Sequence, residues 1–172
     1  MIAAGATVAA APLIRELTPA DRTRIDAMVR ATGLFQDDEA AVALEVFDGA
    51  AASTGPRRDY FGAGAVVDGQ LAGWIVWGPT PCTTGTYDLY WLVIDPELHS
   101  RGIGTALVHE MERRLAGTAR LIVVETAGRP AYAGTRAFYE ARGYRRTATI
   151  PDFYAPDDDL VVYVKALTTL AR

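Results

Sequence analysis

A glycine-rich turn in the middle of the chain joins a predicted strand to a predicted helix. The strand covers residues 86–94, Gly102 and Gly104 follow it, and apolar residues then recur at helical spacing. A second strand, rich in β-branched residues, covers residues 121–126. Two strands joined through a helix lie parallel in one sheet. The chain therefore folds around a sheet that holds at least one parallel pair.

The segment before this unit has the pattern of an antiparallel hairpin. Residues 60–67 and 71–78 are typical of strands, and Asp68-Gly69 lies between them. Both turn residues tolerate positive φ, which the common two-residue hairpin turn requires. The predicted sheet is therefore mixed, with antiparallel strands before the parallel pair.

The remaining predicted elements surround this centre. They are a strand near residues 13–16, helices at 18–33 and from residue 37, a helix at 132–142, and strands at 144–149 and 160–167. This order predicts an α/β fold with a mixed, mostly antiparallel sheet and helices on both faces. We expect one domain over residues 13–170 after a mobile tail at residues 1–12, because 172 residues suit a single core.

The composition is that of a soluble globular protein: 50% of the residues are hydrophobic and 22% are charged. The net charge of −4 argues against a nucleic acid as partner, since phosphate binding needs clustered Lys and Arg. The single cysteine, Cys82, favours a reducing compartment, and no uncharged apolar run reaches the roughly 18 residues of a membrane span. We expect a cytoplasmic protein without a membrane partner. His99 and His109 are too isolated to predict a metal site.

The glycine turn has the chemistry of an anion site. Glycines let a ligand approach the backbone, free N–H groups begin the helix, and Arg101 adds a positive charge. A tight turn without a ligand is the alternative from the glycines alone. The chain lacks the GxxxxGK[ST] pattern of a P-loop, and Leu107 stands where a dinucleotide fold has its third glycine. A nucleotide ligand is therefore the less favoured choice.

Two stretches resemble the GNAT N-acyltransferase superfamily. The first is YDLYWLVIDPELHSRGIG, residues 87–104, which is similar to the coenzyme A motif written as Gln or Arg, two residues, Gly, one residue, then Gly or Ala. His99 stands at the Gln or Arg position and departs from the motif, whereas Gly102 and Gly104 match it. The second is AFYEARGY, residues 137–144, which resembles the family's A-x-Y-E-x-x-G-F/Y element. With the connecting segments, the resemblance extends over about residues 60–167.

The resemblance implies a GNAT-like fold in which the central parallel strands splay apart and hold the pantetheine arm of acetyl-coenzyme A. Leu92 and Ile94 would offer main-chain hydrogen bonds to that arm, and residues 100–105 would hold the pyrophosphate. The implied donor-binding residues are Leu92, Val93, Ile94, His99, Ser100, Arg101, Gly102, Ile103, Gly104, Thr105 and Phe138.

The resemblance also implies a catalytic role for Tyr139. It matches the tyrosine that protonates the leaving thiolate in many members, although a tyrosine beside Phe138 is equally typical of a core. The base is less defined: Asp88, Glu125 and Tyr90 lie on the central strands, and each has a structural role as its alternative. Residues 157–159, three aspartates, are expected to form a solvated hairpin turn, and the neighbouring residues 151–156 are a candidate wall for an acceptor.

The implied reaction is direct transfer of the acetyl group to a primary amine, with a small molecule as the favoured acceptor and a protein or peptide amine as the alternative. A non-catalytic acyl-coenzyme A sensor is a second alternative, and it has no use for Tyr139. Homodimers are common in this superfamily, so a homodimer is possible, but the sequence shows no interface.

Overall fold

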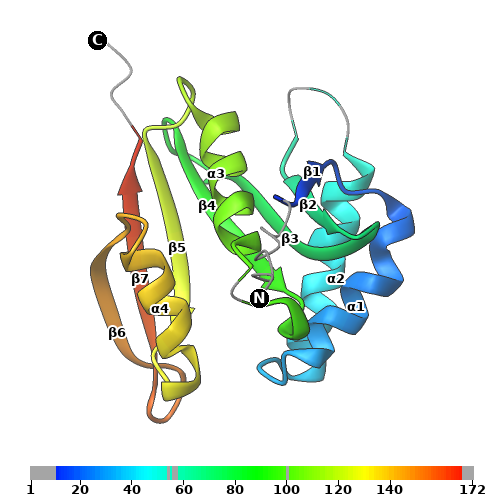
Figure 1. Cartoon of the computed structure of the whole chain (residues 1–172). Coiled ribbons are helices and arrows are strands. Elements are labelled where there is room, and N and C mark those ends of the chain that lie inside the picture. The colour runs from blue at the N-terminus through cyan, green and yellow to red at the C-terminus, as the bar shows by residue number, and fades with distance from the viewer. Residues whose placement is uncertain (1–10, 54, 56–57, 100, 168–172) are drawn as a thin grey trace, which may run out of the picture.

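The structure, a computed structural model, describes residues 11–53, 55, 58–99 and 101–167, so the predicted tail at residues 1–12 lies almost wholly outside it. The described part holds a seven-stranded sheet with the strand order β1-β2-β3-β4-β5-β7-β6 (Figure 1). The strands are β1 Leu13–Arg15, β2 Phe61–Val67, β3 Gln70–Pro79, β4 Thr86–Ile94, β5 Leu121–Ala127, β6 Arg145–Ala155 and β7 Asp158–Ala166. The helices are α1 Arg22–Ala31, α2 Asp37–Ala52, α3 Ile103–Leu115 and α4 Ala133–Glu140, with short 3₁₀ turns at Pro19–Asp21, Pro96–Leu98 and Pro130–Tyr132.

The predicted fold class is confirmed. β4 and β5 pair in parallel, and every other neighbouring pair in the described sheet is antiparallel. The hairpin between β2 and β3 turns at Asp68 and Gly69, whose φ angles are 50° and 79°. Positive φ at both positions is the requirement that predicted this turn.

The last hairpin differs from the prediction. β6 was expected to end at residue 149, but its pairing with β7 resumes after a bulge between Ile150 and Ala155. Asp152 has a φ of 52° in this bulge, and its N–H donates to Asp159 Oδ1 at 3.2 Å. An Asp tolerates the left-handed conformation, which lets the strand continue beyond the kink. The prediction for residues 157–159 was also wrong in part: only Asp157 lies in the turn, and Asp158 is buried at the start of β7.

A bulge in β4 determines which face of the sheet its side chains cover. Leu89 pairs with Trp77 and Trp91 pairs with Val76, so Tyr90 is an extra residue on β4. The bulge reverses the alternation, and as a result Leu89 packs under α3 whereas Trp91 packs under α1 and α2. This is the point at which β4 leaves β5.

The parallel pair is short. The pairing of β4 with β5 ends at Leu89 and Val124, although the strands continue to Ile94 and Ala127. In Figure 1 the two strands lie together near the top and diverge toward the bottom. The predicted splay of the central strands is therefore confirmed, and it leaves one edge of β4 without a strand partner.

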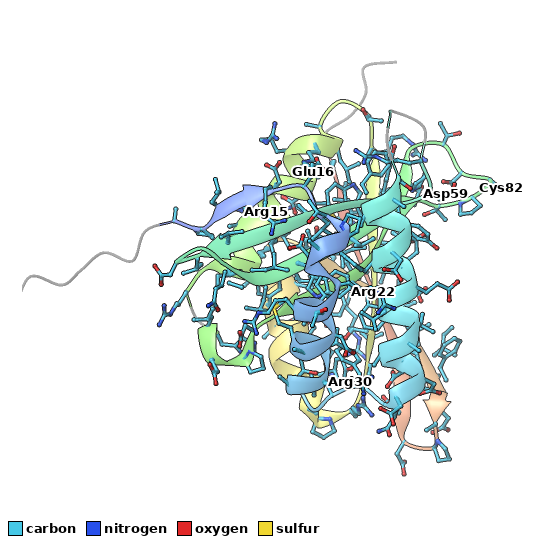
Figure 2. The ribbon with its side chains drawn as sticks, turned by 90° about the vertical axis from the view of Figure 1, so that its right-hand side faces the viewer. Arg15, Glu16, Arg22, Arg30, Asp59 and Cys82 are labelled. Atoms are coloured by element: carbon cyan, nitrogen blue, oxygen red, sulfur yellow. The ribbon has the colours of Figure 1, made fainter. Side chains whose placement is uncertain are left out.

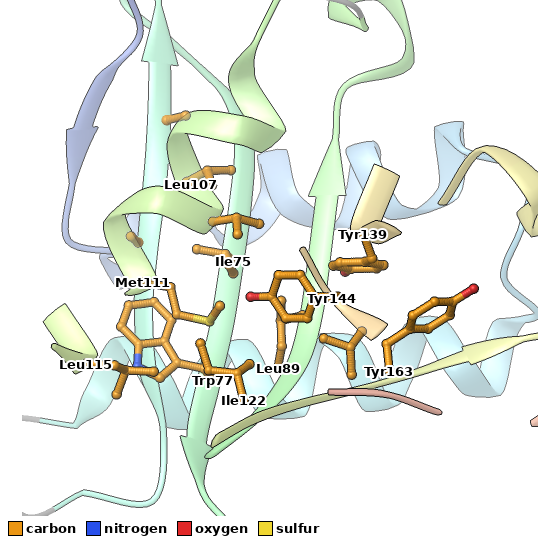
Figure 3. Close-up of a cluster of buried hydrophobic side chains, with 14 of the residues drawn as sticks. Ile75, Trp77, Leu89, Leu107, Met111, Leu115, Ile122, Tyr139, Tyr144 and Tyr163 are labelled. Carbon is orange, nitrogen blue, oxygen red and sulfur yellow. The ribbon is translucent and has the colours of Figure 1, made fainter. Parts of the chain in front are cut away.

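Two separate hydrophobic clusters hold the helices on the sheet. On one face, Leu107, Met111 and Leu115 of α3 pack on Ile75 and Trp77, as Figure 3 shows. On the other face, α1 and α2 pack on Trp74, Val76 and Val93, together with Ile25, Met28 and Phe47. Figure 2 shows α1 and α2 side by side over the sheet, with Cys82 at the periphery on the β3–β4 loop. Among the described helices, none has the length and apolarity needed to cross a membrane.

Candidate active site

A cleft of about 610 Å³ lies where β4 and β5 diverge. We call the part formed by Pro96, Leu98, His99, residues 102–105, Phe138 and Arg142 its α3 end, and the part formed by Thr32, Leu34, Phe35, Ala131 and Tyr132 its α1 end. Nine of the predicted ligand-binding residues line the cleft: Leu92, Val93, Ile94, His99, Gly102, Ile103, Gly104, Thr105 and Phe138. The structure does not place Arg101 on the wall, and Ser100 lies outside the described residues.

The α3 end presents the start of a helix to the cleft. Gly102 is the N-cap of α3 and has a φ of 75°, a conformation that favours glycine. The first hydrogen bond of the helix runs from Ala106 N–H to Gly102 O at 2.9 Å, so the N–H groups of residues 103–105 precede the helical ladder. These N–H groups and the helix dipole favour an anion at this end.

Gly104 has a packing role as well. A Cβ on Gly104 would lie 3.1 Å from the ring of Phe138, so the first turn of α3 approaches α4 closely. This contact brings the glycine turn and the helix that carries Tyr139 to opposite walls of one narrow cleft.

Arg142 lines the α3 end, and the sequence analysis missed it. Its guanidinium lies 3.4 Å from the ring centre of Phe138 and donates to Phe138 O at 2.6 Å and to Thr105 Oγ1. Its Nε is buried without a hydrogen-bond partner among the described residues, and burial lowers the pKa of the group. The four-residue spacing of Phe138 and Arg142 is the sequence signal that both lie on the same wall, although α4 ends at Glu140 and Arg142 lies in the turn after it.

The open edge of β4 supplies backbone groups to the cleft. Asp95 N–H donates to Ala72 O at 2.9 Å, so the backbone of Asp95 faces β3. Because backbone groups alternate along a strand, the N–H and C=O of Leu92 and Ile94 face away from β3. They point to the side where β5 has separated, as the predicted roles of Leu92 and Ile94 require.

Tyr139 both packs in the core and lines the cleft. Its side chain is 4% exposed, and its ring lies 5.3 Å from that of Phe138 and 5.4 Å from that of Tyr144. Figure 3 shows it beside Tyr144 and Tyr163. Burial raises the pKa of Tyr139 well above its usual value, so the hydroxyl keeps its proton at neutral pH. The sequence left two alternatives for Tyr139, a packed core residue and a residue of the active site. The structure combines them, because Tyr139 is buried in the core and also lines the cleft.

The α1 end is assembled from distant segments. Leu34 and Phe35, between α1 and α2, line the cleft together with Ala131 and Tyr132 of the 3₁₀ turn before α4. Phe35 is fixed against Trp91 with a ring separation of 5.1 Å. Burial raises the pKa of the half-buried Tyr132, so its hydroxyl also stays protonated.

The predicted bases lie away from the cleft wall. Asp88 accepts a hydrogen bond from Thr80 Oγ1 at 2.8 Å, and Glu125 is exposed on β5 beyond the point where β4 departs. Neither is among the lining residues, and the same holds for Phe153 and Tyr154 of the candidate acceptor wall. Their roles stay predictions.

The comparisons with known proteins agree with this geometry. The sequence profile of the acetyltransferase (GNAT) family matches residues 25–144. A protein of Desulfovibrio desulfuricans that is assigned to the GNAT family is 36% identical, with 92% of this chain and 100% of that chain covered and a TM-score of 0.82. The chain belongs to the GNAT acetyltransferase family. It is therefore an acyl-coenzyme A-dependent N-acetyltransferase. Family membership favours an enzyme over the alternative of a non-catalytic acyl-coenzyme A sensor.

Other GNAT structures share the fold at lower identity. A ribosomal-protein alanine N-acetyltransferase from Escherichia coli is 16% identical, with 94% of this chain and 97% of that chain covered and a TM-score of 0.75. The aminoglycoside 6'-N-acetyltransferase from Enterococcus faecium is 20% identical, with 93% and 99% covered and a TM-score of 0.70. One acts on a protein and the other on a small molecule, so the GNAT fold does not identify the acceptor. A search of curated proteins finds no match to this chain.

Proposed function

We propose that this GNAT enzyme transfers the acetyl group of acetyl-coenzyme A directly to a primary amine of a small molecule, with both substrates bound in the cleft. The observation that carries the proposal is the single cleft that joins the α3 helix start, the open edge of β4 and the hydroxyl-bearing residue Tyr139. A ternary complex needs both substrates in one such space.

The residues of the α3 end fit the donor. The N–H groups of residues 103–105 and the guanidinium of Arg142 would hold its phosphates, and the open edge of β4 would hold the pantetheine arm. Acetyl-coenzyme A, when bound, supplies an acetyl thioester. A backbone N–H of Leu92 or Ile94 is the donor positioned to stabilise negative charge on the thioester oxygen.

Tyr139 is proposed as the general acid. Its hydroxyl holds a proton at neutral pH and the residue lines the cleft, and we assign that proton to the sulfur that leaves as the C–S bond breaks. The amine must lose a proton as its nitrogen forms the new C–N bond. Asp88 and Glu125 are proposed to accept that proton through water, because neither lines the cleft itself.

No acyl-enzyme is needed in this scheme. Cys82 is exposed on the β3–β4 loop, at the periphery of the view in Figure 2 and outside the lining of the cleft. A nucleophile in a covalent route must reach the donor carbonyl and needs a neighbouring base. The location of Cys82 therefore supports direct transfer.

Calorimetric titration with acetyl-coenzyme A tests the donor, with ATP and NAD as controls. We expect selective binding of acetyl-coenzyme A, followed by turnover with at least one member of a panel of primary amines. Equal affinity for ATP, or no binding by protein that circular dichroism shows to be folded, would contradict the proposed donor site.

A further inference from the structure

One side chain, Arg129, connects the two walls of the α1 end. Its Nη2 donates to Leu34 O at 2.8 Å, across 95 positions of sequence. Its guanidinium also lies 5.0 Å from the ring centre of Tyr132 and 3.8 Å from Asp158 Oδ2. Leu34 and Tyr132 both line the cleft, whereas Arg129 lies behind them and is not itself a lining residue. We call this set of contacts the Arg129 bridge.

The backbone on the Arg129 side of the bridge is firmly held. Gly128 N–H donates to Asp159 O at 2.7 Å, and Arg129 N–H donates to Asp158 Oδ1 at 3.3 Å. Arg136 Nη1 donates to Ala127 O at 2.7 Å and to Arg129 O at 3.1 Å. β5, the start of β7 and α4 therefore fix the position from which the Arg129 side chain extends.

The part of the wall formed by the link between α1 and α2 depends more on the Arg129 bridge. Residues 32–36 link α1 to α2 and lie outside both helices. Leu34 N–H donates to Thr32 Oγ1 at 3.2 Å, a contact within the link itself, and Phe35 packs on Trp91. The bond from Arg129 to Leu34 O is thus the hydrogen bond that ties this link to the α4 side of the cleft.

We infer that Arg129 is a positioning residue that limits the size of the acceptor at the α1 end, so that the enzyme acetylates small amines in preference to amines on a polypeptide. This inference rests on the proposed function and names the acceptor class of that same cleft. A hydrogen bond of 2.8 Å leaves no space for a ligand atom between the guanidinium and Leu34 O.

The volume of the cleft supports the same conclusion. About 610 Å³ is within the range of roughly 300–1,000 Å³ that takes one small organic molecule, and the donor's arm occupies part of it. A polypeptide acceptor would need a passage for its own backbone beyond the reacting amine. The Arg129 bridge holds together Leu34 and Tyr132, two lining residues of the α1 end, so it opposes the separation that such a passage would need.

The test compares Arg129→Ala and Arg129→Lys with the wild-type enzyme on a small alkylamine, an aminoglycoside and a decapeptide with a free N-terminus. Arg129→Lys keeps a positive charge beside the buried Asp158, so it remains testable if Arg129→Ala fails to fold. Arg120→Ala is the matched control, because Arg120 Nε also donates to a loop carbonyl, Thr84 O, at 2.7 Å, away from the cleft.

We expect wild-type kcat/KM to fall from the alkylamine to the decapeptide, and both Arg129 variants to raise the decapeptide-to-alkylamine ratio by about tenfold, the effect of one lost charged hydrogen bond. Arg120→Ala is expected to leave the ratio unchanged. A ratio that is the same in wild type and both Arg129 variants overturns the inference. A wild-type enzyme that prefers the decapeptide overturns it as well.

Hydrogen exchange of the substrate-free protein separates this inference from the proposed function. We expect faster amide exchange at residues 33–36 in the Arg129 variants and not in Arg120→Ala. If acetyl-coenzyme A fails to bind while amide exchange changes as expected, the proposed donor site is wrong. The Arg129 bridge then holds residues 33–36 in place, but it has no role in selecting an acceptor. If the donor binds and exchange at residues 33–36 is unchanged, the bridge does not hold the wall and the inference fails.

Discussion

The two ends of the cleft are built in different ways. The α3 end comes mostly from residues close together in sequence, Pro96, Leu98, His99 and residues 102–105, with Phe138 of α4 and Arg142 just after it. The α1 end brings together Leu34 and Phe35 with Ala131 and Tyr132, which are far apart in sequence, and Arg129 and Asp158 support it from outside the lining. A stretch of chain that presents its own backbone keeps its ligand when many side chains change. An end assembled from separate loops changes whenever one of the loops changes. Such an end suits the acceptor, which is the substrate that differs among members of one family.

Charge separates the two ends further. Arg129 faces Asp158, so the α1 end balances its own cation. Arg142 makes no ion pair with any described carboxylate, and Glu112, which influences its charge, is bound to Lys165 at 2.7 Å. A desolvated cation without a counter-ion favours an anionic ligand. The α3 end is therefore suited to phosphates, and we expect the α1 end to select its ligand mainly by shape.

The largest expected effect concerns Tyr139, which lies between the two ends. We expect Tyr139→Phe to lower kcat about a hundredfold or more, as for loss of a general acid, with acetyl-coenzyme A affinity unchanged. Because burial raises the pKa of Tyr139, its ionisation should cause no fall in kcat below about pH 10. Steady-state kinetics against pH and calorimetry measure both quantities.

Tyr163→Phe is the control for that prediction. Its hydroxyl donates to Glu140 at 2.8 Å and its ring lies 6.4 Å from that of Tyr139, but it does not line the cleft. Equal kcat losses in the two variants would show a packing effect and remove the acid role of Tyr139.

Arg142 tests the charge difference between the ends. We expect Arg142→Gln to raise the Kd for acetyl-coenzyme A by about tenfold or more, since a hydrogen bond to a charged group contributes about 1.5–3 kcal/mol. Arg113→Gln, at an exposed arginine of α3, should leave Kd unchanged. Titration with dephospho-coenzyme A then identifies the phosphate: a loss restricted to coenzyme A assigns Arg142 to the 3'-phosphate. An unchanged Kd in Arg142→Gln would show that Arg142 does not contribute to binding of the donor, and the proposed charge difference between the two ends would have no effect on binding.

The backbone of the α3 end is tested by a matched pair of glycines. Gly102 and Gly117 flank α3 with φ angles of 75° and 77°, and neither has an atom within 4 Å of an added Cβ. Alanine at either position should lower stability by about 1–2 kcal/mol. Only Gly102→Ala is expected to raise the Kd for acetyl-coenzyme A, by about fivefold, because it strains the turn that aims the N–H groups. Equal Kd values in the two variants would show that the conformation of the turn at Gly102 does not determine the affinity for acetyl-coenzyme A.

The same difference between the ends decides what the sequence predicts. The glycine turn, the strand before it and Tyr139 were predicted because local chemistry marks them: a left-handed position, a helix start and a short motif. The β4 bulge at Tyr90 was not, since a bulge is defined by pairing with β3 and not by a residue type.

The two arginines were missed for different reasons. Arg142 follows Phe138 by four positions and folds back on its ring from the turn after α4, so its sequence neighbourhood is a local signal. Arg129 has no local signal, because its partner Leu34 lies 95 positions away and contributes a backbone oxygen. The burial of Asp158 follows from the same long-range contacts, and a run of three aspartates in isolation predicts exposure.

The smallest expected effect concerns the hydroxyl of Tyr132 at the α1 end. Tyr132→Phe removes the hydroxyl and its interaction with Arg129, but it keeps the ring beside the guanidinium and the bond from Arg129 to Leu34 O. We expect KM for the amine to rise about two- to fivefold, the value of one neutral hydrogen bond, while Kd for acetyl-coenzyme A stays the same. Tyr154→Phe, on the exposed part of β6, should change neither constant. If Tyr154→Phe raises KM and Tyr132→Phe does not, the acceptor lies against β6, and the α1 end is not its binding wall.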